Sequence, residues 1–131
     1  MREPLTCSDL AIIVVNAEYE RLHAAFMIAA TTMAIGIRVV MFGMGAGVAA
    51  FCSDWQGVTS FSMEEVRRQK AGVAGLEELR TAVIEMGGEL MVCESGVKVM
   101  GLESDALLKE VRCLGLVCFL EYGGTCRQLV F

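Results

Sequence analysis

Residues Leu10 to Val15 read LAIIVV, an unbroken apolar stretch that decides the fold class. A strand that is apolar at every position is covered on both faces, which is typical of a central strand in a parallel sheet. The segment from Glu18 to Ile35 has apolar residues at spacings of three and four, and Gly36 follows where the helix would end. Ile37 to Phe42 is a second β-branched strand. These segments predict a right-handed β-α-β unit.

The rest of the chain continues this alternation of helices and strands. Ser62 and Glu65 have the spacing of a capping box, which predicts a helix that starts between them. Further elements are predicted at Glu64–Lys70, Leu76–Met86 and Ser104–Val111 as helices, and at Glu89–Cys93, Leu114–Leu120 and Gln128–Phe131 as strands. The order predicts an α/β protein, a three-layer α/β/α sandwich with a mostly parallel sheet of about five strands. No linker or repeat divides it, so residues 1–131 are expected to form a single domain.

The composition limits the classes of partner. A net charge of -5 argues against a nucleic-acid binder, because such proteins usually carry a positive excess on one face. The hydrophobic fraction of 55% and the nine methionines are high for a chain of 131 residues. Apolar surface in excess of what the core needs predicts a homo-oligomer.

The run from Ala24 to Cys52 contains one charge, at Arg38, and is the only place where a membrane span could be sought. Thr31, Gly36 and several later glycines interrupt it, so we expect a helix followed by a strand and no membrane span. The first ten residues carry charges and lack the apolar core of a secretory signal. We therefore expect a cytoplasmic protein whose six cysteines are free thiols.

A metal site is not predicted. The cysteines show none of the paired spacings of structural zinc sites, and His23 is the only histidine. The glycines of Gly43 to Gly47 lack the spacing of a nucleotide-binding loop, and no Lys-Ser/Thr pair follows them. We expect no cofactor.

Ligands and catalysis in open parallel sheets belong to the edge where the strands end at their carboxyl ends. Cys93 ends a predicted strand and is the candidate catalytic residue. A thiol within a nest of backbone amides, or at the start of a helix, has its thiolate stabilised. The residues expected to line a cleft around it are Asn16, Gly43, Gly45, Ser95, Gly96 and Tyr122.

Two observations leave alternatives open at this stage. A cysteine at a strand end is often only a small buried apolar residue, and the charge of Glu94 would oppose a thiolate. Cys52 follows the glycine-rich segment and is a candidate for a second, resolving or acceptor thiol. Cys113 and Cys118 would point to opposite faces of one regular strand, and we expect both in the core.

The stretch from Cys93 to Leu102, CESGVKVMGL, resembles the segment with Cys, Ser and Met-Gly in the DsrE/DsrF-like (DsrEFH-like) family. The amino-terminal half is similar too, in the strand Ala11 to Val15, the start of the helix after it, and Val39 to Gly43. This resemblance implies a three-layer fold, oligomerisation and a role in intracellular sulfur trafficking. The segment from Glu121 to Arg127 is too short for the helix that many relatives carry before their last strand.

Members of that family hold sulfane sulfur as a persulfide on the matching cysteine, which is Cys93 here, and pass it to TusA-like or rhodanese-like proteins. The resemblance thus implies a sulfur carrier or sulfurtransferase, loaded by another protein or by a small inorganic sulfur donor, and a homo-oligomer such as a trimer, tetramer or hexamer. Two alternatives are a non-catalytic assembly subunit of a sulfur-relay complex and a peroxiredoxin-like thiol redox protein that uses Cys93 with Cys52.

Overall fold

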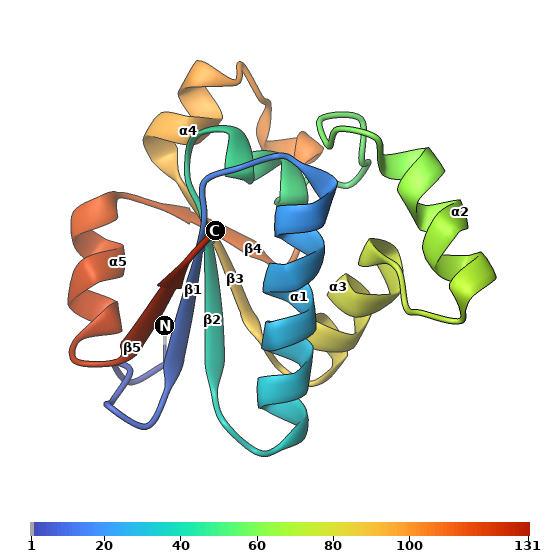
Figure 1. Cartoon of the computed structure of the whole chain (residues 1–131). Helices are drawn as coiled ribbons and strands as arrows, with labels where there is room; N and C mark the ends of the chain where they lie inside the picture. The colour runs from blue at the N-terminus through green and yellow to red at the C-terminus, as the bar shows by residue number, and fades with distance from the viewer. Residues whose placement is uncertain (1) are drawn as a thin grey trace.

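The computed structural model describes residues 2–131 (Figure 1). One five-stranded sheet runs through the molecule in the order β4-β3-β2-β1-β5, and every neighbouring pair is parallel. Its strands are β1 (Leu10–Val14), β2 (Val39–Gly43), β3 (Glu89–Cys93), β4 (Val111–Leu114) and β5 (Arg127–Val130). The predicted parallel sheet is confirmed.

Helices cover both faces of this sheet. They are α1 (Tyr19–Ala34), α2 (Phe61–Ala71), α3 (Leu76–Glu85), α4 (Glu94–Val99) and α5 (Leu116–Gly123), with the 3-10 helices η1 (Gly45–Phe51) and η2 (Ser104–Ala106). Figure 1 shows α1 and α3 on one face and α5 on the other, which confirms the predicted three-layer α/β/α sandwich. Within residues 2–131, none of the helices combines the length and the apolar character that a bilayer-spanning helix requires.

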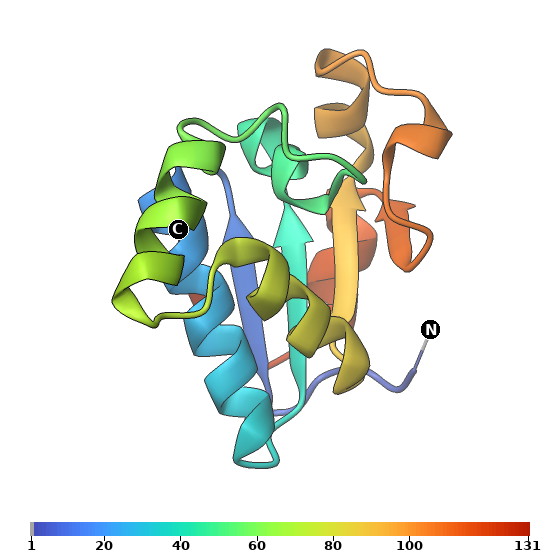
Figure 2. The ribbon, with the colours of Figure 1, turned by 90° about the vertical axis from the view of Figure 1, so that its right-hand side faces the viewer.

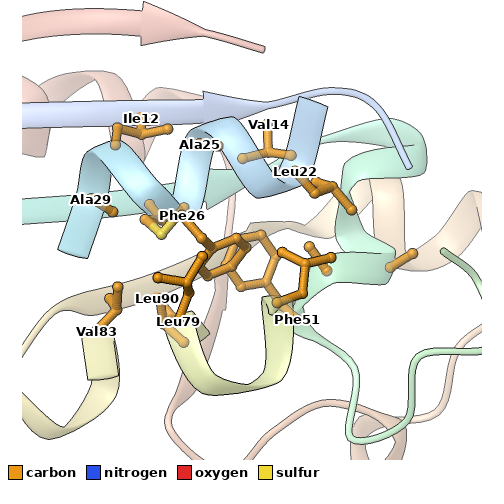
Figure 3. Close-up of a cluster of buried hydrophobic side chains, with 14 of the residues drawn as sticks. Ile12, Val14, Leu22, Ala25, Phe26, Ala29, Phe51, Leu79, Val83 and Leu90 are labelled. Atoms are coloured by element: carbon orange, nitrogen blue, oxygen red, sulfur yellow. The ribbon is translucent and has the colours of Figure 1, made fainter. Parts of the chain in front are cut away.

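The unbroken apolar pattern of β1 follows from its place between the two layers. Ile12 and Val14 point into the cluster under α1 and α3, whereas Ala11 and Ile13 point into the cluster under α5. Figure 3 shows the larger cluster, in which Phe26 of α1 meets Phe51 of η1. The centroids of these two fully buried rings lie 6.1 Å apart. Burial of each ring contributes about 2–3 kcal/mol to folding.

Helix α2 has no fully buried residue, and it is attached to this sandwich by the partly buried Phe61 and by polar contacts. The Glu65 carboxylate accepts hydrogen bonds from the hydroxyl of Tyr19 and the backbone amide of Leu76, both at 2.5 Å. It thereby satisfies the free amide at the start of α3. Figure 2 shows α2 at the side of α1 and α3, away from the sheet.

Two predicted elements are wrong. Ser104–Val111 is not a helix, because only its first three residues form the short η2 and the chain then extends into β4. Leu114–Leu120 is not a strand: β4 ends at Leu114, and Gly115 precedes α5. The chain before the last strand therefore contains a helix, α5, which begins upstream of Glu121. The capping box is also wrong, since α2 starts one residue before Ser62 and its N-cap is Ser60.

Candidate functional site

Cys93 lies at the carboxyl edge of the sheet, where β3 passes directly into α4. It is the last residue of the strand and the N-cap of the helix, with an extended backbone of φ -78° and ψ 132°. Figure 2 shows α4 and η1 together at this edge, above the ends of β2 and β3. The thiol of Cys93 therefore lies beside the first backbone amides of α4.

The surroundings of the Cys93 sulfur have opposing effects on its ionisation. Burial raises the pKa of the thiol, and the charge of Glu94 also raises it. Hydrogen bonds to the sulfur from the Ser95 side chain, the Ser95 amide and the Gly96 amide lower it. The distance between Cys93 Sγ and Ser95 Oγ is 3.1 Å. The hydrogen bonds prevail, so the pKa of Cys93 lies below the ordinary thiol value and a larger share is thiolate at neutral pH.

The rest of the Cys93 side chain packs in the apolar cluster on the α5 face. The residue is 4% exposed and belongs to the same cluster as Met91, Phe42 and Phe119. The rings of Phe42 and Phe119 are stacked with centroids 4.1 Å apart. The sulfur is therefore held by polar donors on the α4 side and by an apolar wall on the sheet side.

The glycines at this edge allow η1 and α4 to approach each other. A Cβ atom on Gly96 would lie 2.7 Å from a methyl carbon of Val48 and 3.0 Å from the amide nitrogen of Gly45. At Gly43 an added Cβ would lie 2.7 Å from the ring of Phe51. Real Cβ atoms do not tolerate such distances to rigid neighbours. The structure thus brings Gly45, Gly96 and Cys93 into one compact unit.

Of the remaining residues expected to line a cleft, Asn16 lies at the same edge and Tyr122 does not. The Asn16 side chain follows β1 and accepts a hydrogen bond from the Glu18 amide at 2.8 Å. Tyr122 lies near the end of α5, which runs back toward the start of the strands. There its hydroxyl donates to Glu89 at 2.5 Å and accepts from Arg38. The expectation that Tyr122 lines a cleft at the carboxyl edge is wrong, because it assumed a strand where α5 forms.

The Tyr122 hydroxyl is instead part of a polar network at the amino edge of the sheet. Burial and the neighbouring Glu89 raise its pKa to about 12, so it stays protonated at neutral pH and donates to that carboxylate. Arg38 joins the network by an ion pair of 3.4 Å with Glu89. These contacts tie α5 to β2 and β3, a structural role.

Cys52 is placed on the other side of the sheet from Cys93. It follows η1, and its carbonyl accepts a hydrogen bond of 2.8 Å from Arg80 of α3. Its Sγ lies 3.7 Å from the carbonyl oxygen of Val48, and burial raises the pKa of its thiol. This position favours neither a direct bridge to Cys93 nor a reactive thiolate.

The other cysteines are free thiols with different exposures. Cys113 on β4 and Cys118 on α5 are exposed, so the expectation that both lie in the core is wrong. The reason is that β4 is an edge strand and Cys118 lies on the outer side of α5. Cys7 is exposed and Cys126 is buried.

Two apolar residues near Cys93, Met44 and Leu114, were not among the predicted site residues. Both are partly buried and pack against the cluster that holds the thiol. Leu114 was assigned to the start of a strand rather than to its end, which moved it away from the carboxyl edge. The helical spacing of Leu116, Phe119 and Tyr122 after Gly115 was the available signal for the correct boundary.

The fold and the site define a class of small parallel α/β proteins with a cysteine between the third strand and a short helix. The sequence model of the DsrE/DsrF-like family matches residues 9–131, and the chain belongs to that family. Family membership points to a role related to sulfur relay. No curated protein sequence matches the chain.

Solved structures support the fold assignment. The YchN protein from E. coli is similar with a TM-score of 0.73 at 14% identity, over 95% of this chain and 99% of that chain. A protein of unknown function from Methanobacterium thermoautotrophicum, MTH1491, is similar with a TM-score of 0.60 at 13% identity, over 92% of this chain and 98% of that chain. At these identities the likeness concerns the fold alone.

The hydrogen bond between Ser95 and Cys93 leads to a prediction about the pKa of the Cys93 thiol. Ser95→Ala removes a donor to the thiolate, so the pKa of Cys93 should rise and alkylation at neutral pH should slow several-fold. The measurement is the pH dependence of iodoacetamide labelling of the Cys93 peptide, read by mass spectrometry. Ser62→Ala on the exposed face of α2 is the control. An unchanged midpoint in Ser95→Ala would show that the hydroxyl does not act on the sulfur.

Proposed function

We propose that this protein is a sulfur carrier that holds sulfane sulfur as a persulfide on Cys93 and passes it to a thiol of a partner protein. The single observation that supports this most is the Cys93 sulfur itself, which accepts hydrogen bonds from Ser95 and Gly96 at the carboxyl edge. Membership in the DsrE/DsrF-like family supports it independently.

The chemistry needs little more than this site provides. The Cys93 thiolate attacks a sulfane sulfur of the donor, an S–S bond of the donor breaks, and its electron pair leaves with the donor fragment. In the second step a partner thiolate attacks the outer sulfur, and Cys93 leaves as a thiolate. The same hydrogen bonds that lower the pKa of Cys93 stabilise it as this leaving group. Neither step consumes an external oxidant or reductant.

The chemistry indicates the class of sulfur donor, and the family resemblance implies the partner proteins. Inorganic polysulfide, thiosulfate and tetrathionate carry transferable sulfur, and TusA-like or rhodanese-like proteins present the thiols that would receive or supply it. The proposed setting is the cytoplasm, where thiols stay reduced.

The test is direct loading of reduced protein. Each donor is incubated with the chain, and the masses of the intact protein and of its cysteine peptides are measured. We expect one added sulfur on the Cys93 peptide from at least one donor, and its loss when an acceptor thiol is added. Absence of sulfur on Cys93 with every donor would contradict the proposal.

The proposed homo-oligomer is supported by the outer face of α5. Val117 is 69% exposed and Leu120 is 48% exposed on α5, which covers this side of the sheet. Covering such side chains with a second copy would remove apolar surface from water.

Val117→Glu is therefore expected to shift the protein toward the monomer, because a charge would be buried in the contact. The measurement is light scattering during gel filtration at matched concentrations. Val66→Glu on α2, where the valine is 47% exposed, is the control. A wild-type protein that is monomeric at every concentration would exclude the oligomer.

A further inference from the structure

Arg80 is a buried charged residue that the proposed chemistry does not use. It lies on α3 and is 3% exposed. Its guanidinium carbon lies 3.7 Å from the centroid of the Trp55 ring, and the group forms an ion pair of 3.5 Å with Glu77. Burial lowers the pKa of Arg80, because the charged form loses its hydration. A buried charge is destabilising unless it is well paired, so the hydrogen-bond partners of Arg80 indicate its role.

These partners are two backbone carbonyls at the end of η1. The Nη1 nitrogen of Arg80 donates to the Ala50 carbonyl at 3.0 Å and to the Cys52 carbonyl at 2.8 Å. The last carbonyls of a helix have no partner within that helix. The Ser53 amide, which would close the next turn on Ala50, donates instead to the Ala106 carbonyl at 2.8 Å. Arg80 therefore supplies the donor that the end of η1 needs.

The end of η1 is connected to the part of η1 that packs against α4. The Cys52 Sγ lies 3.7 Å from the carbonyl oxygen of Val48. The Val48 side chain lies directly against the backbone of Gly96, because a Cβ added there would meet a Val48 methyl at 2.7 Å. Figure 2 shows η1 between α3 and α4. A shift at the end of η1 would therefore displace the first turn of α4.

Gly96 in that first turn contacts the reacting atom. Its amide donates a hydrogen bond to the Cys93 sulfur, beside the two donors of Ser95. The Ser95 hydroxyl can rotate to follow the sulfur, whereas the direction of an amide is fixed by the backbone. The contact between Gly96 and the sulfur thus depends on where α4 begins relative to β3. Both of these elements pack against η1.

We propose that Arg80 is a positioning residue that holds η1 against α4 and thereby holds the Gly96 amide at the Cys93 sulfur. The assignment rests on the proposed function, since it concerns the thiolate that attacks the sulfur donor. Arg80 acts indirectly, through the carbonyls of Ala50 and Cys52. Without Arg80 these carbonyls would turn to find another donor, because a buried carbonyl without a partner is destabilising.

The test measures the Cys93 thiol in variants of Arg80. The pH midpoint of iodoacetamide labelling of the Cys93 peptide is read by mass spectrometry. Arg80→Met keeps much of the bulk but donates no hydrogen bond. We expect the midpoint to rise and labelling at neutral pH to slow by about threefold or more. Arg80→Gln is too short to reach both carbonyls and should shift the midpoint in the same direction, so it replaces Arg80→Met if that variant does not fold.

Two comparisons separate positioning from other effects of the substitution. Arg80→Lys keeps the charge and a nitrogen with several protons, so it should restore most of the wild-type midpoint. Val83→Ala is the control for stability, because Val83 is fully buried on α3 one turn after Arg80. Its truncation destabilises the same helix and should leave the midpoint unchanged.

A second readout separates positioning from the loss of a positive charge. The NMR shift of the Gly96 amide proton reports its hydrogen bond to the sulfur. We expect this proton to move upfield in Arg80→Met, as the hydrogen bond lengthens, and to keep its shift in Val83→Ala.

Each outcome bears on Arg80 separately from sulfur transfer. An unchanged midpoint in a folded Arg80→Met or Arg80→Gln protein would overturn its role. A raised midpoint with an unchanged Gly96 amide would also overturn it, since charge alone would then act on the thiol. An equal shift in Val83→Ala would overturn it too, because general loosening would explain the result. Labelling needs no sulfur donor, so a wild type that takes up no sulfur would contradict only the carrier function.

Discussion

Cys93→Ser is expected to lower sulfur transfer to an acceptor thiol by about a thousandfold or more, because a nucleophile that forms the covalent intermediate is lost. Serine keeps the size of the side chain, but its hydroxyl is not ionised at neutral pH. The Ser95 and Gly96 donors that lower the pKa of the thiol cannot create an alkoxide. The readouts are sulfur on the residue-93 peptide and the rate of transfer to an acceptor protein thiol.

The exposed cysteines require a matched control for this prediction. Cys7, Cys113 and Cys118 are exposed and can also take up sulfur. If transfer proceeds through Cys93, Cys118→Ser should leave transfer unchanged, as should Cys52→Ser if Cys52 is not an acceptor thiol. Transfer that persists in Cys93→Ser would contradict the carrier function. Cellular sulfur transfer that survives Cys93→Ser but not disruption of the oligomer would favour the alternative of an assembly subunit.

Gly47→Ala is expected to destabilise the protein by about 3 kcal/mol, since the added methyl group overpacks a rigid contact. Gly47 lies in η1 against the end of β1, and a Cβ atom there would overlap the backbone carbonyl of Val14. A backbone atom cannot move aside as a flexible side chain can. Displacement of η1 would also disturb α4, because Gly45 and Gly96 are in close contact. We therefore expect slower loading of Cys93 in this variant.

The measurement is the urea unfolding midpoint at a fixed protein concentration, because assembly would make stability depend on concentration. Gly115→Ala is the control: an added Cβ has no neighbour within 4 Å, and the backbone φ of -77° suits alanine. Its change should stay within about 1 kcal/mol. A Gly47→Ala variant as stable as Gly115→Ala would show that the contact with Val14 is not rigid.

The central strands and α1 could be predicted because their local patterns are strong. Leu10–Val14 is apolar on both faces, and the long helix after it has a regular apolar stripe. Glu89–Cys93 was predicted with its observed bounds, which placed Cys93 at the carboxyl edge. These patterns arise from burial, which acts on each segment wherever it lies in the chain.

The carboxyl-terminal third was harder to predict because its apolar runs are short. The segment from Leu114 to Leu120 is apolar enough for a buried strand. In the structure Leu114 ends β4, Gly115 links the two elements, and the remaining residues lie in α5. Periodicity does not separate a short buried strand from a short buried helix. Because a strand was predicted here, Tyr122 was placed at the wrong edge of the sheet, and Leu114 was not recognised as a residue near the thiol.

The sequence by itself determined the class of the fold, the position of Cys93 at the end of a strand, and the likeness to the DsrE/DsrF-like family. Only the tertiary structure decided which residues lie near the sulfur: the donors Ser95 and Gly96, and the apolar residues Met44 and Leu114 that pack against its cluster. The physical reason is that burial leaves a local pattern in the chain. The register between parallel strands depends on hydrogen bonds and packing between segments that are far apart in sequence. It therefore cannot be predicted from the pattern of any single segment.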